Sequence, residues 1–256
     1  MATILQGIQK NRFYIFLCFF IGFWGLQACG KKSLRDYYFP LKQLKEQSKV
    51  YEYQFSTADT TLKIYWYYQV VIQGDSVYLV GNCYDAGFHP LMLMREEQVA
   101  NGMKLKELIY YGVNQQGFST KTTATIEGGA VFPFQVQDDK SVFVNVIKYS
   151  DLKDSTITTT LTRNRRFLKE TTYDFKGKQL DAAEFEMKEE QSEKDPKRGG
   201  WVHVYNIQEL YAKNIGLIYS KRTLNNGLSF ETKLVDIYTM SELEEKFKRH
   251  LNESKQ

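Results

Sequence analysis

Three residues in one short segment have side chains that could do chemistry. The segment 83–89 reads CYDAGFH, so a thiol (Cys83), a carboxylate (Asp85) and an imidazole (His89) fall within seven residues. Such a set could ligate a metal ion or form a Cys–His nucleophilic pair. The spacing matches no strong metal template, Asp-Ala-Gly is ordinary turn chemistry, and Cys83 fits an apolar strand position. A structural turn is therefore favoured over a ligand or metal loop at this point.

The rest of the chain offers few groups of the kind that enzymes use. His203 lies in an alternating segment, where it faces solvent or a satisfied core contact, and His250 lies on the polar margin of the tail. The sequence contains no G-x-S-x-G, H-E-x-x-H, P-loop or dinucleotide-binding glycine pattern. The basic run Arg163-Asn164-Arg165-Arg166 falls at a predicted strand junction, where a solvated turn is favoured over an anion site. We predict a protein that is not an enzyme and that holds no cofactor or metal.

Aromatic residues indicate a different kind of chemistry, the binding of an apolar ligand. The chain has 18 Tyr, 17 Phe and 3 Trp, and one predicted strand contains Tyr65, Trp66, Tyr67 and Tyr68 in succession. Successive side chains of a strand point to opposite faces, so this run puts rings on both faces. One interpretation is a core face plus an outer face covered by the tether or the tail. The other is a concave apolar surface that holds an acyl chain or another hydrophobic ligand.

The elements that must position these residues are short strands. From residue 50 onward, β-prone segments alternate with turn signals such as Asn225-Asn226-Gly227, and Asn-Gly is a strong hairpin signal. Little helical periodicity separates the segments, so consecutive strands are expected to pair as an antiparallel meander. The predicted strands are 50–56, 62–72, 76–84, 105–113, 118–126, 130–136, 142–149, 156–163, 167–175, 179–187, 216–224 and 228–238.

A long meander must curl to hide its edges, so we predict an all-β fold with a curved sheet. A barrel, a half-barrel and a sandwich remain open. We assign residues 49–240 to this domain and residues 241–256 to a short C-terminal amphipathic helix and tail. Ser241 and Glu244 have the spacing of a capping box. The apolar stripe of this helix, which we expect to pack on the body, consists of Leu243, Phe247 and Leu251.

The segment 184–200 departs from the strand pattern. It reads EFEMKEEQSEKDPKRGG and is dominated by charged residues, with a proline and two glycines at its end. This composition is typical of an exposed loop. A solvated connector is favoured over a loop that docks a protein partner.

The first thirty residues carry an export signal. Lys10 and Arg12 precede an uncharged run from Phe13 to Ala28, which is shorter than the roughly 20 apolar residues that a membrane-spanning helix needs. A basic start followed by a short apolar run that ends in small residues is typical of a secretory signal peptide. The run ends in Leu26-Gln27-Ala28-Cys29, which resembles the lipobox of bacterial lipoproteins. The alternative is an ordinary signal peptide or an uncleaved anchor.

The resemblance to bacterial lipoproteins implies a modified N-terminus. Signal peptidase would cut between Ala28 and Cys29 and remove residues 1–28 as the signal peptide. Cys29 would carry a diacylglyceryl group on sulfur and often an acyl chain on its new amino group. Two or three acyl chains give stable membrane anchoring where one is marginal. Residues 29–48 would then form a lipidated tether, in which we expect the aromatic patch Tyr37–Leu41 to dock on the body.

The residues after the cysteine indicate which compartment the lipid anchor faces. Surface-exported lipoproteins of the Bacteroidota tend to carry acidic residues there, whereas this chain has Gly30-Lys31-Lys32. The resemblance therefore implies a lipid anchor in the bacterial cell envelope, at the outer membrane and facing the periplasm. Loss of residues 1–28 would lower the formal net charge from +4 to +2, which gives no footprint for nucleic acid.

A lipid anchor, a long antiparallel meander and a terminal helix are together similar to the half-barrel lipoproteins of the bacterial envelope, among them the lipoprotein-localisation carrier and receptor. The similarity of the body is architectural. It implies a non-enzymatic protein that binds a hydrophobic small molecule or a lipid inside a curved sheet. The alternatives are an accessory subunit of an envelope protein complex and an enzyme or metal site around Cys83, Asp85 and His89.

Overall fold

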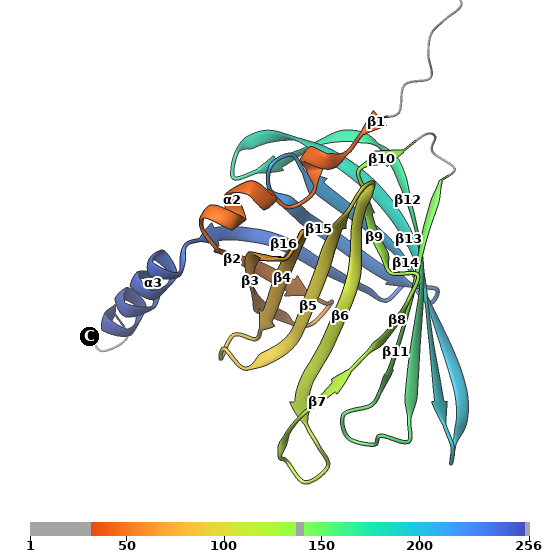
Figure 1. The fold of residues 1–256 in the computed structure, drawn as a ribbon. Helices are drawn as coiled ribbons and strands as arrows, with labels where there is room; N and C mark the ends of the chain where they lie inside the picture. Colours follow the sequence, from red (N-terminus) through yellow and green to blue (C-terminus); the bar gives the residue numbers. More distant parts are fainter. Residues whose placement is uncertain (1–31, 137–140, 254–256) are drawn as a thin grey trace, which may run out of the picture. The chain divides into compact units, whose positions relative to one another are not determined.

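Antiparallel β-strands make up most of the structure (Figure 1). The computed structural model describes residues 32–136 and 141–253, with side chains up to Arg249. Its helices are the 3-10 helix η1 (Arg35–Tyr37), α2 (Leu41–Glu46) and α3 (Met240–Glu253). Its strands are β1 (Lys32–Ser33), β2 (Lys49–Ser56), β3 (Thr61–Gln73), β4 (Ser76–Tyr84), β5 (Pro90–Val99), β6 (Gly102–Val113), β7 (Ser119–Thr123), β8 (Thr125–Glu127), β9 (Ala130–Pro133), β10 (Gln135–Val136), β11 (Val142–Ser150), β12 (Thr158–Phe175), β13 (Lys178–Asp195), β14 (Gly199–Ala212), β15 (Gly216–Leu224) and β16 (Ser229–Tyr238).

Fourteen of the described strands form one antiparallel sheet that is nearly closed into a barrel (Figure 1). The order along the sheet is β7-β6-β5-β4-β3-β2-β16-β15-β14-β13-β12-β11-β8, and β9 pairs with β6 beside this path. Consecutive strands pair through most of it, as a meander requires, and β2 pairs with β16. The two ends of the path, β7 and β8, are separated in sequence only by Ala124, whose N–H donates to the carbonyl of Leu108 on β6 at 2.9 Å. The all-β prediction is confirmed, and the sheet takes the barrel-like form.

The segment from Leu34 to Glu46 lies across one end of the barrel (Figure 1). The Leu34 N–H donates to the Phe134 carbonyl at 2.8 Å, and the Asn214 N–H donates to the Asp36 carbonyl at 2.7 Å. Leu34 is fully buried, and Leu44 is 2% exposed. Tyr37, Tyr38 and Phe39 are 8%, 2% and 7% exposed, so the expected docking of the Tyr37–Leu41 patch is observed and the segment forms part of the core.

One glycine makes the close approach of this segment possible. Gly216 has φ of +101°, and a Cβ on it would lie 2.6 Å from the Phe39 ring. Any other residue there would be strained in its backbone and would displace the ring. Phe39 in turn packs on Tyr68 of β3, with ring centroids 4.5 Å apart. The N-terminal segment is thus fitted to the rim of the barrel by specific contacts.

The aromatic run on β3 divides its rings between the two faces of the barrel wall. Tyr68 belongs to the interior core, and Trp66 stacks on it with ring centroids 5.5 Å apart. Tyr65 and Tyr67 belong to an outer cluster that includes Leu243 and Phe247 of α3. The interpretation of a core face plus an outer face covered by the tail is confirmed. The stripe of α3 packs on the body as expected through Leu243 and Phe247, while the side chain of Leu251 lies outside the described residues.

The N-terminal cap of α3 is two residues earlier than predicted. The Thr239 hydroxyl accepts the Glu242 N–H at 3.2 Å, and the Glu242 carboxylate accepts the Thr239 N–H at 2.6 Å. This reciprocal pair is a capping box. The prediction of Ser241 with Glu244 was wrong because the helix begins at Met240.

Several strand boundaries also differ from the prediction. Strand β5 was missed, and the predicted strands 118–126 and 130–136 are each divided in two. The first division falls where the pairing changes: β7 pairs with β6 and β8 pairs with β11, and Ala124 lies between them.

The charged segment 184–200 is not a loop, which corrects the sequence prediction. Strand β13 continues to Asp195, and β14 begins at Gly199, so the turn between them is short. The strand still alternates: Phe185, Met187 and Glu189 are buried, while the residues between them are more exposed. The charge run conceals this alternation because one inward residue, Glu189, is a carboxylate neutralised by two arginines.

The basic run Arg163–Arg166 is also not at a strand junction. Strand β12 runs without interruption from Thr158 to Phe175. Arg165 is buried, whereas Asn164 and Arg166 are exposed. The solvated turn that was favoured is therefore wrong, because alternation along the strand directs Arg163 and Arg165 to the inside of the barrel.

Candidate functional site: the lumen of the barrel

Of the three residues that were singled out for chemistry, the structure pairs Asp85 with His89 and leaves Cys83 buried in the strand that precedes them. Cys83 is buried in β4, and burial raises the pKa of its thiol to about 12. Asp85 and His89 lie in the loop after β4, where the imidazole Nδ1 is 3.0 Å from the carboxylate and the His89 side chain is 79% exposed. The Asp85 carboxylate also accepts the Gly87 and His89 N–H groups at 2.8 Å. This is turn chemistry, as favoured from the sequence.

Some of the remaining sequence candidates fall on residues that the structure describes, and others do not. Within residues 32–136 and 141–253, no three His, Cys, Asp or Glu side chains are grouped so as to hold a metal ion. His203 on β14 is exposed. The lipobox residues Ala28 and Cys29 lie outside the described residues. In the part of the chain that is described, no helix is both long and apolar enough to cross a bilayer.

The lumen of the barrel contains a cavity that the sequence did not reveal. Its volume is about 210 Å³, and its lining is apolar on most sides, with three methionines, Met92, Met94 and Met187. Trp66 from β3 and Val131 from β9 are also part of the apolar wall. The charged or amide side chains that line the cavity are Glu96, Asn145, Arg163 and Arg165, and Tyr110 adds a phenol.

Strand register explains why these polar groups gather. Asn145 on β11 is directly opposite Arg163 on β12, and Phe143 is opposite Arg165 in the next inward-facing pair. Arg165 is in turn opposite Met187 on β13. Cross-strand partners have Cβ atoms about 5 Å apart on the same face. Three neighbouring strands therefore bring an amide, two guanidinium groups and apolar side chains to one wall.

Arg165 is the centre of a buried ion pair. Its guanidinium contacts the Glu209 carboxylate and donates to the Val131 carbonyl, and its Nη2 lies 3.4 Å from the Tyr211 hydroxyl. Burial opposes the charge on Arg165, but Glu209, Tyr211 and Glu96 together outweigh this effect and raise the pKa of the guanidinium. Two side chains of this wall hold β9, since Arg165 donates to the Val131 carbonyl and Asn145 Nδ2 donates to the Ala130 carbonyl at 3.2 Å.

A second buried carboxyl group, Glu96, connects the cavity to the N-terminal segment. The Tyr38 hydroxyl donates to Glu96, and both side chains are buried. Burial raises the pKa of Glu96, against the opposing effects of the Tyr38 hydrogen bond and the Arg165 charge. Burial and the adjacent Glu96 raise the pKa of Tyr38 well above its usual value. Tyr38 thus stays a hydrogen-bond donor to Glu96.

A third cluster lies nearby on the same strands. Glu189 accepts from Arg163 Nε at 2.6 Å and from the Arg222 guanidinium. The Arg222 guanidinium also lies over the Tyr205 ring, 3.7 Å from its centroid. Glu189 is 1% exposed, so its charge depends on these two arginines for stabilisation.

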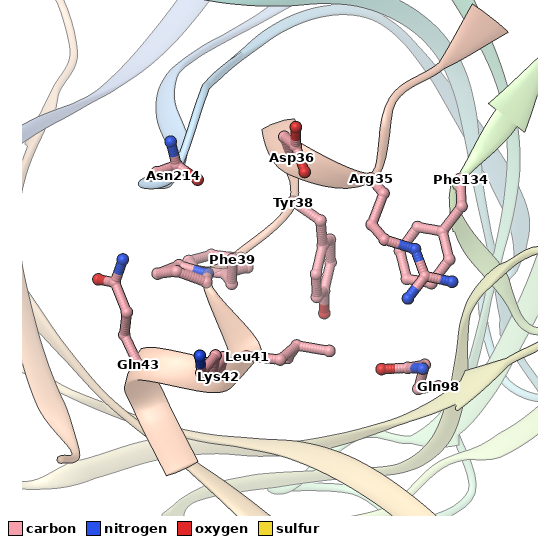
Figure 2. Close-up of a pocket in the computed structure, with 11 residues that line it drawn as sticks. Arg35, Asp36, Tyr38, Phe39, Leu41, Lys42, Gln43, Gln98, Phe134 and Asn214 are labelled. Carbon is pink, nitrogen blue, oxygen red and sulfur yellow. The ribbon is translucent and has the colours of Figure 1, made fainter. Parts of the chain in front are cut away.

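The hollow between the N-terminal segment and the barrel rim is larger but differently built (Figure 2). It has a volume of about 390 Å³. Arg35 lies over the Phe134 ring, 4.3 Å from its centroid, and Gln98 faces the same space. Tyr38 lines this hollow with its ring and reaches Glu96 with its hydroxyl, so it stands between the hollow and the lumen cavity.

A groove on the outside of the barrel lies between α3 and the wall. Its volume is about 660 Å³, and Tyr65, Phe247 and Arg249 are among its lining residues. Lys63 and Lys246 on its border are both bound to the buried Glu52, at 2.9 and 2.6 Å. Lys246 thereby holds α3 to the wall, and Lys63 links β3 to β2.

Comparison with known proteins identifies the fold. No protein-family model matches the chain, and no curated protein matches its sequence significantly. The chain is similar to the crystal structure of a candidate exported protein with a YmcC-like fold from Bacteroides fragilis, with a TM-score of 0.56 and 13% identity over 79% of this chain and 99% of that one. It is also similar to a candidate lipoprotein from Parabacteroides distasonis, with a TM-score of 0.51 and 12% identity over 78% and 97% of the two chains. At these identities the similarity shows a shared fold.

Proposed function

We propose that the chain is a lipid-anchored protein of the bacterial envelope that binds a hydrophobic small molecule or a lipid in the lumen of its barrel, without catalysis. The observation that carries this proposal is the lumen cavity of about 210 Å³. Protein interiors are close-packed and contain few voids larger than a water molecule. Small barrels are either filled by side chains or hold one small ligand. Pockets for drug-sized ligands measure roughly 300–1,000 Å³, so this cavity suits a small molecule or a single short chain.

The chemistry of the cavity wall supports an apolar ligand. Methionines are flexible and polarisable, and they adapt to ligands of differing shape. Three of them line this cavity together with Trp66 and Val131. The separation of buried Cys83 from exposed His89 supports binding over catalysis at the loop after β4.

The proposed anchor rests on the lipobox Leu26-Gln27-Ala28-Cys29. The two chains of similar fold support it, because one is described as a candidate exported protein and the other as a candidate lipoprotein. Gly30-Lys31-Lys32 after the cysteine supports an anchor in the outer membrane that faces the periplasm. Lysines close to an anionic membrane surface contribute on the order of 1 kcal/mol each to its binding.

A cavity-filling substitution tests the proposed binding. We expect Val131→Phe to fill the lumen and to abolish the lipid that co-purifies with the full chain, as measured by mass spectrometry of organic extracts. The matched control is Val144→Phe, since Val144 is 44% exposed on β11. The control should keep the bound lipid.

Three outcomes would contradict the proposal. One is that no lipid or small molecule accompanies the wild-type chain, and another is that both variants carry the same amount as wild type. Intact mass would contradict the anchor if the mature chain began elsewhere than at a lipidated Cys29. A stoichiometric protein that co-purified from detergent in place of a ligand would favour the accessory-subunit alternative.

A further inference from the structure

Arg163 brings unused hydrogen-bond donors to the wall of the lumen cavity. Its Nε donates to Glu189 at 2.6 Å, and neither Nη1 nor Nη2 has a hydrogen-bond partner among residues 32–136 and 141–253. These two atoms are not among the buried polar atoms that lack a partner, and the Arg163 side chain is 30% exposed. Because alternation along β12 directs this cavity-lining side chain into the barrel, its exposed Nη groups face the lumen.

The Tyr110 hydroxyl is a second unused donor in the same part of the wall. Tyr110 is directly opposite Met92 in the pairing of β5 with β6, and both side chains line the cavity. Within the described part of the chain, its hydroxyl has no hydrogen-bond partner, and it is not among the buried polar atoms that lack one. Burial raises the pKa of Tyr110 to about 12, against the opposing charge of Arg163. The hydroxyl therefore keeps its proton at neutral pH and can donate it to a ligand.

The ion cluster around Arg163 carries one positive charge in excess. Arg163 and Arg222 share the single carboxylate of Glu189. Arg165, in contrast, is matched by Glu209. A guanidinium group binds a carboxylate through two parallel N–H bonds, and such charge-assisted bonds are stronger than those between neutral groups. A ligand with one negative charge would therefore complete the pairing at Arg163.

The remaining wall is largely apolar and offers space for an aliphatic chain. The side chains of Met92, Met94, Met187 and Trp66 come from three different strands. A ligand that contacts them gains by removing apolar surface from water. Burial raises the pKa of Glu96, a carboxyl group in the same lining, and this weakens its repulsion of an anion. Cationic donors on one side and apolar atoms on the other favour a ligand with two different ends.

We propose that the lumen binds a single-chain amphiphile with a carboxylate head, such as a fatty acid. The carboxylate accepts hydrogen bonds from the Arg163 Nη groups and from the Tyr110 hydroxyl, and the aliphatic chain lies against the methionines. A carboxylate carries the one negative charge that the cluster lacks, whereas a phosphate monoester carries about 1.5 to 2 at neutral pH. This inference rests on the proposed function, because it names the class of ligand for the same cavity.

Methionine methyl groups report directly on this site. The full chain, in phosphatidylcholine nanodiscs and with ¹³C-labelled methionine methyl groups, would be titrated at pH 7.5 with octanoate, octanamide and octyl phosphate, after correction for partition into empty nanodiscs. Octanoate should shift the resonances of Met92, Met94 and Met187, while Met240, which is 46% exposed outside the cavity, should not move. Octanamide keeps the chain but loses the charge, so it should bind about tenfold more weakly. Octyl phosphate should also bind more weakly than octanoate.

A matched pair of tyrosine variants tests the hydroxyl. Tyr110→Phe keeps the ring and removes the donor, so it should lower the affinity for octanoate about tenfold. The control is Tyr149→Phe, because the Tyr149 ring packs on Tyr110 with centroids 4.5 Å apart but is not part of the cavity lining. This control should keep the affinity of the wild type.

A second pair of variants tests the guanidinium group. Arg163→Lys keeps a cation beside Glu189 but removes the two Nη groups, so it should reduce the preference for octanoate over octanamide. Arg166→Lys makes the same change on the outer face of β12, where Arg166 pairs with Glu186, and should leave the preference unchanged. The unfolding midpoint of each variant would confirm that it is folded.

The outcomes separate this inference from the proposed function. If octanamide or octyl phosphate moved the three methionines and bound as tightly as octanoate, the carboxylate assignment would be wrong and the proposed function would stand. The same conclusion would follow if folded Tyr110→Phe and Arg163→Lys both bound octanoate like the wild type. If no probe moved the three methionines, both proposals would be overturned.

Discussion

Arg165 in the lumen and Glu52 on the outer face are both buried charges, but different parts of the chain enclose them. Arg165 and its partner Glu209 lie on β12 and β14, each of which is hydrogen-bonded to neighbours on both sides. Glu52 lies on β2 facing outward, where it is bound by Lys63 of β3 and by Lys246 of α3. The lumen pair is exposed only if the barrel opens. Glu52 and its lysine partners become exposed to solvent as soon as α3 detaches from the barrel wall.

The pKa of the buried carboxyl group is also shifted in opposite directions at the two places. In the lumen, burial is the dominant effect and raises the pKa of Glu96. On the outer face, burial also opposes ionisation of Glu52, but hydrogen bonds and charges from Lys246 and Lys63 outweigh it and lower the pKa. The difference comes from the bonded partners, which are two lysines at Glu52 and the Tyr38 hydroxyl at Glu96. We expect the two kinds of enclosure to differ in local stability, which separate measurements can resolve.

Removal of Arg165 should have the largest effect on stability. Arg165→Met leaves Glu209 buried without its partner, and such a change costs about 3–5 kcal/mol. We expect a loss of this size in the free energy of unfolding, measured by urea denaturation. The control is the neighbouring Arg166→Met, because Arg166 pairs with Glu186 at the surface, where both side chains are nearly half exposed. Surface pairs contribute about 0–1 kcal/mol.

A double variant tests whether the loss of stability comes from the unpaired charge of Glu209. Arg165→Met combined with Glu209→Leu removes both charges, and replacement of a whole buried pair by apolar residues is often close to neutral. Much of the lost stability should therefore return. Equal losses for Arg165→Met and Arg166→Met would show that the lumen pair is not enclosed as described.

A smaller and local effect is expected from α3. Leu243 is 4% exposed in the outer cluster, and truncation of a buried leucine costs about 2–5 kcal/mol. Leu243→Ala should therefore increase hydrogen exchange within α3, measured by mass spectrometry, while the urea midpoint of the barrel changes little. The control Met240→Ala lies on the same helix but is 46% exposed. A barrel midpoint that fell together with α3 protection would show that the two are one cooperative unit.

The sequence predicted the elements that have local signals. Strand 76–84 has its predicted bounds because turn residues flank an alternating run, and 216–224 is bounded in the same way. Strand β5 was missed because its sequence, PLMLMREEQV, mixes apolar residues and adjacent charges without alternation. The register shift between Arg95 and Glu96 explains that irregularity, since it turns the strand at the point where Glu96 becomes buried.

The lumen site could not be predicted, because its parts meet only in the closed barrel. Arg165 and Glu209 are 44 residues apart, and Tyr38 and Glu96 are 58 apart. In the sequence, Arg165 is one of several adjacent basic residues and Glu189 is part of a charge run. Uninterrupted alternation through both charged segments was the one available signal, since an inward charge on a strand implies a buried partner. The segment from Cys83 to His89 was more conspicuous in the sequence, but its candidate residues lie close together in the chain because they belong to a turn.

Acidification should produce the smallest effect, with opposite signs in the two regions. Glu52 has a pKa below its ordinary value of 4.5, so it stabilises the docked helix above about pH 4.5, and this stabilisation is lost as the pH falls through the lowered pKa. Glu96 has a raised pKa, so the destabilisation that its charge causes at neutral pH is relieved as the pH falls towards 4.5. Hydrogen exchange, corrected for intrinsic rates, should therefore show α3 opening in acid before the strands do. Glu52→Gln should flatten the pH dependence of α3 alone, and Glu96→Gln should flatten that of the strands. If α3 in Glu52→Gln still opened with the wild-type pH profile, another group would control its release.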